Sequence, residues 1–489
     1  MRRLAAACLL AAGAAMAVEV PQSAAQWQNS AAADIEAAYQ LLLDNHPGTY
    51  DPANPDFASR LAGARKAGLQ LAAQVLDGAG YQAALSRFNA ALHDGHAGVV
   101  FLAPSSVQWR WPGFVAVWRG DGMYVYASVP GGPAAGSRVE SCDGLPIARV
   151  VESNVFAFQG RADEPGNWWA EAADVFVDKG NPFIQLPRVC SFSLKGQPFS
   201  MTLAWSAYTD EMLRWRRLSY NGDVLPVGLS EPRSRLYWAA MPEFQPDQAQ
   251  RAAYRVMSAE LREHPERYQQ ADAMVIDLRG NHGGSSMWSL DFASALWGDE
   301  EVARRDAART GAQQVWWRAS TGNVKHVRWL VGMLKEQGNA QQAVSINAVA
   351  DAMQQALEAG ERFFVSGARK PDVASNAAAA ATAARPAFTR PVYVIVPGQC
   401  VSACLDALDY FTMFPNTKLV GAPSSADSTY MEVRYQPLDS GLARVVIPTK
   451  VYVGRPRSAG QFYTPHITVS DLDWSTTNFL TAIEADLKR

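Results

Sequence analysis

The spacing of apolar residues divides the chain into three regions. Between residues 26 and 103, apolar side chains recur every three or four positions, as they do on the buried face of a helix. This pattern predicts helices over residues 31–45, 56–77 and 81–92, followed by a strand at 99–102. We therefore expect residues 26–103 to form a helical N-terminal domain.

The second region, residues 105–205, has short strands separated by turns. Apolar runs at 113–117 and 123–126 flank Gly120-Asp121-Gly122, which predicts a β-hairpin. A glycine, a strand and the turn Asp143-Gly144 then follow one another, an order that resembles a PDZ domain. The resemblance implies that Trp111-Pro112-Gly113-Phe114 is similar to the loop that grips a peptide carboxylate, with the peptide added as a strand. A β-barrel spacer is the alternative.

The third region, from residue 236 onward, alternates strands with helices. Buried strands are expected at 273–278 and 392–396, and helices at 287–297 and directly after residue 402. Such alternation is typical of a parallel α/β layer with helices on its faces. The predicted fold class is therefore α/β, or α+β, with several domains.

A long insertion separates the two buried strands. It covers about residues 300–390 and contains two expected amphipathic helices, at 323–335 and 344–361. Its last part, residues 376–390, is rich in alanine and low in complexity. Two interpretations of this part stay open, a flap over a functional site and a tolerated surface insertion.

Composition and charge narrow the class of protein. The chain has 489 residues, of which 48% are apolar and 10% aromatic, enough for two or three domains with hydrophobic cores. The formal net charge is −3, so nothing indicates binding to nucleic acid or to a membrane surface. No internal stretch of 18 apolar residues occurs, and no membrane-spanning helix is expected.

Residues 1–17 have the features of a signal peptide. Arg2 and Arg3 precede an apolar stretch at residues 4–16, and Ala15-Met16-Ala17 matches a cleavage signal. The mature chain is therefore expected to be exported, to a bacterial periplasm or to the exterior of the cell.

Four cysteines follow the signal peptide: Cys142, Cys190, Cys400 and Cys404. An exported protein can form disulfides, and Cys142–Cys190 with Cys400–Cys404 is the preferred pairing among three connectivities. Small buried thiols are the alternative. No metal site is expected, because no histidine lies near the closely spaced pair in sequence.

Ser402 lies where a buried strand gives way to a helix. The strand at 392–396 ends in Pro397-Gly398, and apolar residues at helical spacing begin at Leu405. Such a turn presents a serine at the carboxyl edge of a sheet, beside the free N–H groups of a helix. This is the arrangement of a nucleophile elbow, although the GxSxG sequence is missing. A serine that only caps the helix is the alternative.

A second informative stretch, Asp277-Leu278-Arg279-Gly280-Asn281-His282-Gly283-Gly284, follows the other buried strand. Gly283 and Gly284 open a helix, and their backbone N–H groups are accessible to whatever docks there. Such donors can form an oxyanion hole or an anion site of another kind.

These features together resemble the tail-specific, or C-terminal processing, protease family of serine peptidases. The resemblance rests on the stretch at 277–284, the serine turn at 402, the segment Asp94-Gly95-His96-Ala97-Gly98 and the early Asn45-His46-Pro47-Gly48.

The resemblance implies a crotonase-like catalytic core over residues 236–489 with Ser402 as the nucleophile. It implies that the oxyanion donors are the N–H groups of Ala403 and of Gly283 or Gly284. It also implies a polypeptide substrate and no cofactor.

The family activates its serine in two ways. One branch uses a lysine downstream of the serine, but Asp427 occupies that position here, and Lys418 and Lys450 match no motif. The other branch is tricorn-like and uses a histidine from an upstream Asp-Gly-His segment. His96 matches that histidine, and an imidazole with an ordinary pKa of about 6.5 can accept the proton of Ser402 at neutral pH.

Enzymes of the histidine type orient the imidazole with a glutamate, and Gln461 stands at that position here. The carbonyl oxygen of Gln461 can accept the imidazole N–H, but it cannot offset the charge of an imidazolium ion. Asp427 and Glu432 are the candidates for that charge. The missing glutamate predicts a weak or conditionally active enzyme.

The sequence therefore predicts an exported serine endopeptidase that cleaves polypeptides through an acyl-enzyme. A peptide-binding pseudoenzyme of the same fold is one alternative, favoured by Gln461. A small-ligand or lipid-binding module, similar to retinoid-binding relatives of the fold, is another, and its binding would not depend on Ser402. An esterase would use the same residues as the peptidase.

Overall fold

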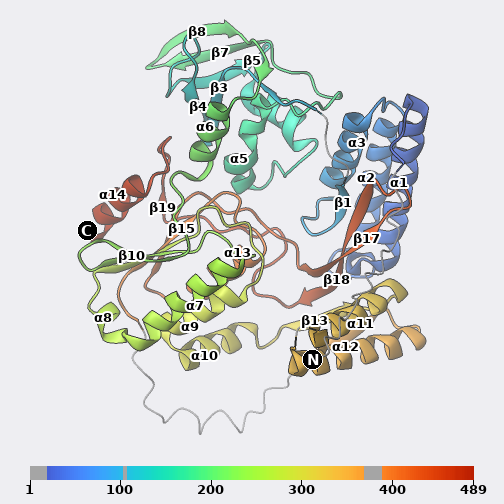
Figure 1. The fold of residues 1–489 in the computed structure, drawn as a ribbon, viewed down its shortest axis with the longest axis vertical. Helices are drawn as coiled ribbons and strands as arrows, with labels where there is room; N and C mark the ends of the chain where they lie inside the picture. Colours follow the sequence, from blue (N-terminus) through green and yellow to red (C-terminus); the bar gives the residue numbers. More distant parts are fainter. Residues whose placement is uncertain (1–18, 103–106, 337, 368–387) are drawn as a thin grey trace, which may run out of the picture.

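The computed structural model describes residues 19–102, 107–336, 338–367 and 388–489. The expected signal peptide lies outside these residues, as does most of the alanine-rich segment at 376–390. Helices and sheets form several units (Figure 1), so the predicted α/β, or α+β, multidomain class is confirmed. Within the described residues, no helix is both long and apolar enough to cross a membrane.

Three helices form the N-terminal unit close to where the sequence predicts them. They are α1 (Ala24–Asn45), α2 (Phe57–Ala72) and α3 (Gly78–Leu92), with the short 3-10 helix η1 (Pro47–Thr49) after α1. α1 begins earlier than predicted because Ser23 and Gln26 form a capping box, in which each side chain accepts the backbone N–H of the other.

The N-terminal helices pack on strands from the far end of the chain. β1 (Gly98–Phe101) pairs antiparallel with β18 (Ala443–Val453), and β17 (Tyr430–Pro437) pairs with the other edge of β18. Figure 1 shows the three helices against β17 and β18. The core that they share includes Leu438, Leu442, Val445 and Ile447. The N-terminal unit therefore completes its core with C-terminal residues.

The second unit has a sheet in the order β3-β4-β5-β7-β8, with β6 paired to β5. Its strands are β3 (Phe114–Arg119), β4 (Gly122–Ser128), β5 (Arg138–Cys142), β6 (Leu145–Pro146), β7 (Val189–Leu194) and β8 (Gln197–Thr202). A separate ladder joins β2 (Arg110–Trp111) and β9 (Ser206–Ala207). The predicted hairpin is β3 with β4, and a disulfide between Cys142 and Cys190 links β5 to β7.

Helix α6 (Asp210–Asn221) lines a small groove of the second unit beside β3. The other helices of this unit are α4 (Ile147–Val151), the π-helix η2 (Glu152–Phe156), α5 (Pro165–Glu171) and η3 (Ala172–Phe176). The groove lies between β3 and the helices α5 and η3, and side chains of α6 line it too. The groove encloses a cavity of about 30 Å³. Peptide recognition by the unit stays a prediction.

The third unit is built on a six-stranded sheet in the order β10-β11-β12-β15-β16-β19. β10 is antiparallel to β11, and the other pairs are parallel, as the alternation of strands and helices predicts. The strands are β10 (Gly228–Arg233), β11 (Leu236–Ala240), β12 (Ala273–Asp277), β15 (Val392–Val396), β16 (Thr417–Gly421) and β19 (Ile467–Thr468). The helices are α7 (Gln248–Glu263), α8 (Pro265–Gln269), α9 (Met287–Trp297), α10 (Asp299–Thr310), α13 (Ala403–Phe411) and α14 (Thr476–Leu487). Every residue of β12 and β15 is buried, so these strands anchor the turns that follow them.

The insertion between β12 and β15 adds two strands to the sheet that contains β1, β17 and β18. Beyond α10 it contains β13 (Gln314–Arg318), α11 (Thr321–Glu336), α12 (Ala340–Glu358) and β14 (Phe363–Ser366). β13 pairs with β18, and β14 pairs with β13. The two predicted helices are α11 and α12, whereas the two strands beside them were not predicted.

Candidate active site

Ser402 lies between β15 and α13 in a backbone conformation that few residues other than glycine adopt. Its φ and ψ are 54° and −126°, and such a conformation costs about 1–3 kcal/mol. The side chain makes no capping hydrogen bond to α13. The interpretation of Ser402 as a helix cap is therefore wrong, and its hydroxyl is available for another role.

A disulfide closes the turn that carries Ser402. Cys400 and Cys404 are bonded across it, and both residues are buried in the core of the third unit. Both disulfides of the chain follow the preferred pairing, so the alternative of isolated buried thiols is wrong.

Gly283 lies beside the serine turn, and Gly284 follows it against Phe244. Their φ values are 93° and 131°, and a Cβ added to Gly283 would lie 2.9 Å from the Cβ of Ser402. The Gly283 N–H already donates to Asn281 Oδ1 at 2.8 Å. Within the described part of the chain, no hydrogen bond engages the N–H of Gly284 or of Ala403. These two groups are therefore the better candidates for oxyanion donors.

His96 is presented by a tight turn between α3 and β1. His93 ends α3 in the left-handed conformation, with φ of 57°. Asp94 then accepts the backbone N–H of His96 at 2.9 Å, which is the bond of an Asx turn. No role was predicted for Asp94 from the sequence, although an Asp two residues before the histidine is the signal of this turn.

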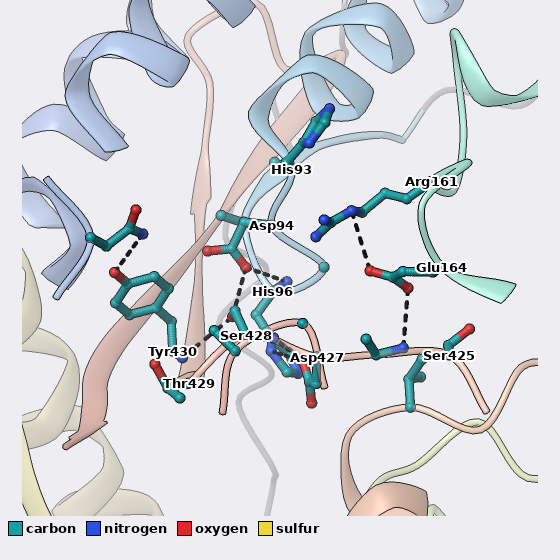
Figure 2. A pocket seen from close by; sticks show the side chains of 18 of the residues that line it. His93, Asp94, His96, Arg161, Glu164, Ser425, Asp427, Ser428, Thr429 and Tyr430 are labelled. Carbon is teal, nitrogen blue, oxygen red and sulfur yellow. Dashed lines mark hydrogen bonds and ion pairs between the residues drawn. The ribbon is translucent and has the colours of Figure 1, made fainter. Parts of the chain in front are cut away.

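The structure brings His96 and Asp427 together in one cleft (Figure 2). Asp427 lies between β16 and β17, and its Oδ1 is 3.0 Å from His96 Nδ1. The alignment at Nδ1 falls short of a hydrogen bond, so the contact is an ion pair by distance. The side chains of His96 and Asp427 are only 17% and 3% exposed. Water therefore screens their interaction weakly.

Charges around His96 favour its protonated form. Burial alone would lower the pKa of the imidazole, but Asp427, Asp94 and Asp406 outweigh it and raise that pKa above the ordinary value. Asp406 stands one helical turn after Ser402, and its backbone N–H donates to the Ser402 carbonyl oxygen at 3.1 Å. The negative charge that acts on His96 from Asp406 therefore comes from the helix that follows Ser402.

Gln461 lies outside the cleft that contains His96 and Asp427. Its Oε1 accepts the backbone N–H of Ser458 at 3.1 Å, and it lines a separate surface depression with Arg309 and Asp409. The other candidate, Glu432, has its carboxylate 3.4 Å from Lys450 Nζ. Of the three candidates for the group that faces His96, the structure places Asp427 there.

Arginine pairs fix the segment that precedes Gln461. Arg455 and Arg457 both pair with Asp406 and Asp409 on α13. The Arg457 Nη2 to Asp406 Oδ1 distance is 2.9 Å. These pairs hold the segment against the serine helix and direct Gln461 to the outside of the cleft.

The cleft around His96 has a volume of about 1050 Å³. That is the upper end of the range for small-molecule pockets, about 300–1,000 Å³. Val401, the neighbour of Ser402, lines it together with the turn at 94–98 and the segments 425–430 and 453–455. The cleft therefore has room for an extended chain, and the serine turn lies at its wall.

The second unit holds the loop that carries Asp427. Glu164 accepts the backbone N–H of Ala426 at 3.1 Å. A Cβ added to Gly166 would lie 2.3 Å from the carbonyl carbon of Ser424, so the two backbones touch. Sequence analysis missed Glu164 and Gly166, and no local pattern indicates a contact between segments so far apart in the chain.

Comparison with known proteins points to one family of peptidases. The sequence profile of peptidase family S41 matches residues 240–467, the part of the chain that carries Ser402 and Asp427. The predicted resemblance to a family of serine peptidases is thereby confirmed.

Solved structures match the chain over nearly its whole length. The crystal structure of mature CPAF is 13% identical, with 94% of this chain and 96% of that chain covered and a TM-score of 0.60. Mature CPAF complexed with lactacystin is 14% identical, with 94% and 97% covered and a TM-score of 0.58. At such identities the likeness shows a shared fold. No curated protein matches the chain in sequence.

Proposed function

We propose that the mature chain is an exported serine endopeptidase with Ser402 as nucleophile and His96 as general base. The observation that carries the proposal is the position of the His96–Asp427 pair in the cleft beside the Ser402 turn. Because Nδ1 faces the buried carboxylate, Nε2 is the nitrogen that is left for the serine hydroxyl.

The proposed reaction uses three side chains and two backbone N–H groups. Ser402 Oγ attacks the peptide carbonyl carbon while its proton passes to His96 Nε2, and Asp427 stabilises the imidazolium that forms. The N–H groups of Gly284 and Ala403 donate to the oxyanion of the tetrahedral intermediate. His96 then returns the proton to the leaving amine, and water hydrolyses the acyl-enzyme with His96 again as base.

The carboxylate of Asp427 argues against the alternative that the chain is a pseudoenzyme. That interpretation rests on the absence of a glutamate at position 461. In this structure a buried aspartate from another loop stands 3.0 Å from the imidazole, so the site has a charge to offset an imidazolium ion. The strained Ser402 with its uncapped hydroxyl supports an active enzyme as well.

The proposal of export to a periplasm or to the cell exterior rests on the signal-like segment at 1–17. The two disulfides support it, because disulfides persist in oxidising compartments and are rare in the cytosol.

Hydrolysis of an unfolded protein tests the proposal. The purified mature chain, Ser402→Ala and the matched control Ser345→Ala are incubated with casein between about pH 5 and pH 9. Ser345 is an exposed serine of α12. We expect fragments from the parent chain and from Ser345→Ala, and none from Ser402→Ala. Equal cleavage by Ser402→Ala would refute the proposal.

Lactacystin is a suitable probe, because CPAF, which shares the fold, has been solved with it.

A further inference from the structure

The Asp94 carboxylate links two segments of the proposed site. Its Oδ1 accepts the His96 N–H at 2.9 Å and the Ser428 hydroxyl at 3.0 Å. Its Oδ2 lies 3.1 Å from His46 Nε2. Figure 2 shows the carboxylate between the turn that carries His96 and the segment that carries Asp427 and Ser428. The side chain of Asp94 is 3% exposed, so water does not replace these contacts.

His46 is a fixed hydrogen-bond donor to Asp94. Its Nδ1 accepts the Gly48 N–H at 2.9 Å, so Nε2 is the ring nitrogen that carries a proton toward Asp94. The ring is buried, stacked on Phe57 at 4.2 Å between centroids and packed against Tyr430 at 4.7 Å. A turned ring or the other tautomer would lose both hydrogen bonds.

The surroundings of His46 leave no room for adjustment. A Cβ added to Gly48 would lie 2.7 Å from the Phe57 ring and 2.9 Å from His46 Nδ1. The Tyr430 hydroxyl donates to Asp51 at 2.8 Å, and Tyr430 itself starts β17, two residues after Ser428. The N-terminal unit thus reaches the site through a chain of buried contacts.

We infer that Asp94, oriented by His46, is a positioning residue that holds His96 and the Asp427–Ser428 segment in one geometry. This inference rests on the proposed function, because it assigns a role in the same site. Without the Asp94 carboxylate, the distance between His96 and Asp427 would depend on two loops from opposite ends of the chain. Because Asp94 bonds to both loops, this one side chain fixes the position of each.

Asp94 also brings a charge to the site. Burial opposes its ionisation, but the hydrogen bonds from His46 and from the His96 N–H lower the pKa of Asp94 below the ordinary value. The ionised carboxylate in turn helps to raise the pKa of His96. Asp406 and Asp427 also act on His96 as anions. Among the nearby cations, Arg161 interacts with Asp94, and Arg455 interacts with Asp406 and Asp427.

The test compares Asp94→Asn with the matched control Asp34→Asn in the full chain. Asp34 is also a buried carboxylate, 3% exposed, and it accepts hydrogen bonds from Tyr81 and Ser440 in the N-terminal core. Both variants lose a buried charge, so both are expected to unfold at a lower temperature. Only Asp94→Asn is expected to change the chemistry of the site.

Two measurements separate the variants. For Asp94→Asn we expect kcat to fall by about 10–100-fold with little change in KM, since a misplaced base slows the chemical step. We also expect the pKa of His96, followed by NMR of ¹³C-labelled histidines, to fall by about half a unit or more. Asp34→Asn should retain both the parent kcat and the parent histidine titration.

Variants of His46 distinguish positioning from packing. In His46→Gln the amide reaches the place of Nε2 and can donate to Asp94, whereas the side chain of His46→Asn is too short. Both lose the aromatic ring and its stacking. We expect His46→Gln to retain more kcat than His46→Asn at similar thermal stability, and equal loss in both would contradict the role of the donor.

The outcomes for the inference and for the proposed function are distinct. If the parent chain cleaves casein through Ser402 but Asp94→Asn matches Asp34→Asn in kcat and in the His96 titration, the inference is wrong and the peptidase stands. If the parent chain shows no Ser402-dependent cleavage, the proposed function fails, and an unchanged His96 titration in Asp94→Asn still overturns the inference. If Asp94→Asn does not fold, Ser428→Ala removes one of the bonds alone, and an unchanged kcat and titration in it overturns the inference as well.

Discussion

Replacement of Asp427 by asparagine removes the charge that faces His96 and keeps the shape of the side chain. The distance from Asp427 Oδ1 to His96 Nδ1 is 3.0 Å, and the carboxylate is almost wholly buried. With an effective dielectric constant of about 20, a carboxylate and an imidazolium at that distance attract each other by about 5 kcal/mol. Asp94 and Asp406 also favour protonated His96, so part of the stabilisation survives the substitution.

We therefore expect Asp427→Asn to lower kcat about a thousandfold, which corresponds to about 4 kcal/mol. The amide adds to the effect, because its N–H favours the tautomer in which Nε2 carries the proton and cannot accept that of Ser402. KM should change little, since the Asp427 carboxylate faces the imidazole. The assay is the initial rate on a quenched fluorescent peptide, with thermal unfolding to establish that the variant is folded.

Gln461→Ala gives the contrasting result that the structure predicts. Gln461 lies outside the cleft, and its side chain accepts a hydrogen bond from the backbone of its own loop. Its loss should therefore leave kcat close to that of the parent chain. The assignment of Asp427 would be refuted if kcat fell less than about tenfold in folded Asp427→Asn, or more than about tenfold in Gln461→Ala.

Three further predictions concern the same site. Because nearby carboxylates raise the pKa of His96 and the base must be neutral, kcat/KM should rise with pH through a midpoint above 6.5; a pH–rate profile with a lower midpoint contradicts this. Gly283→Ala should remove activity and cost about 1–3 kcal/mol of stability by denaturant unfolding, since φ is 93° and the new Cβ would lie 2.7 Å from the Val401 carbonyl oxygen. Replacing both Cys400 and Cys404 by alanine should lower kcat, whereas replacing Cys142 and Cys190 should cost about 2–4 kcal/mol of stability and spare kcat; the reverse pattern would show that the Cys400–Cys404 bond does not support the serine turn.

Local sequence patterns were sufficient to predict the elements that position Ser402, the proposed nucleophile. The run of β-branched residues at 392–396 and the helix at 287–297 have the bounds that the sequence predicts. A buried strand, then small residues, then apolar residues at helical spacing predict a sharp turn at Ser402. The cysteines on either side of Ser402 are near enough in sequence to pair. These features depend on neighbours along the chain.

The partner of His96 depends on contacts that no local pattern reveals. Asp427 and Gln461 both follow the family's motifs loosely. The packing of their loops decides which of the two side chains faces His96. Glu164 holds the backbone next to Asp427, while arginine pairs with α13 direct Gln461 outward. The same holds for His46 and Asp94, whose hydrogen bond joins residues 48 positions apart.

The second unit shows the same limit. Its hairpin β3–β4 follows from turn chemistry. Helix α6, which lines a groove beside β3, was not predicted, because its packing depends on how a helix from beyond the sheet folds back onto it.

Covalent trapping of the nucleophile tests the central claim most directly. The parent chain and Ser402→Ala are treated with a fluorophosphonate probe at several pH values, and the modified peptide is identified by mass spectrometry. The account predicts one adduct, on Ser402, formed at a rate that rises as His96 loses its proton and that drops strongly in Asp427→Asn. An adduct on another residue, or equal labelling of Ser402→Ala, would contradict it.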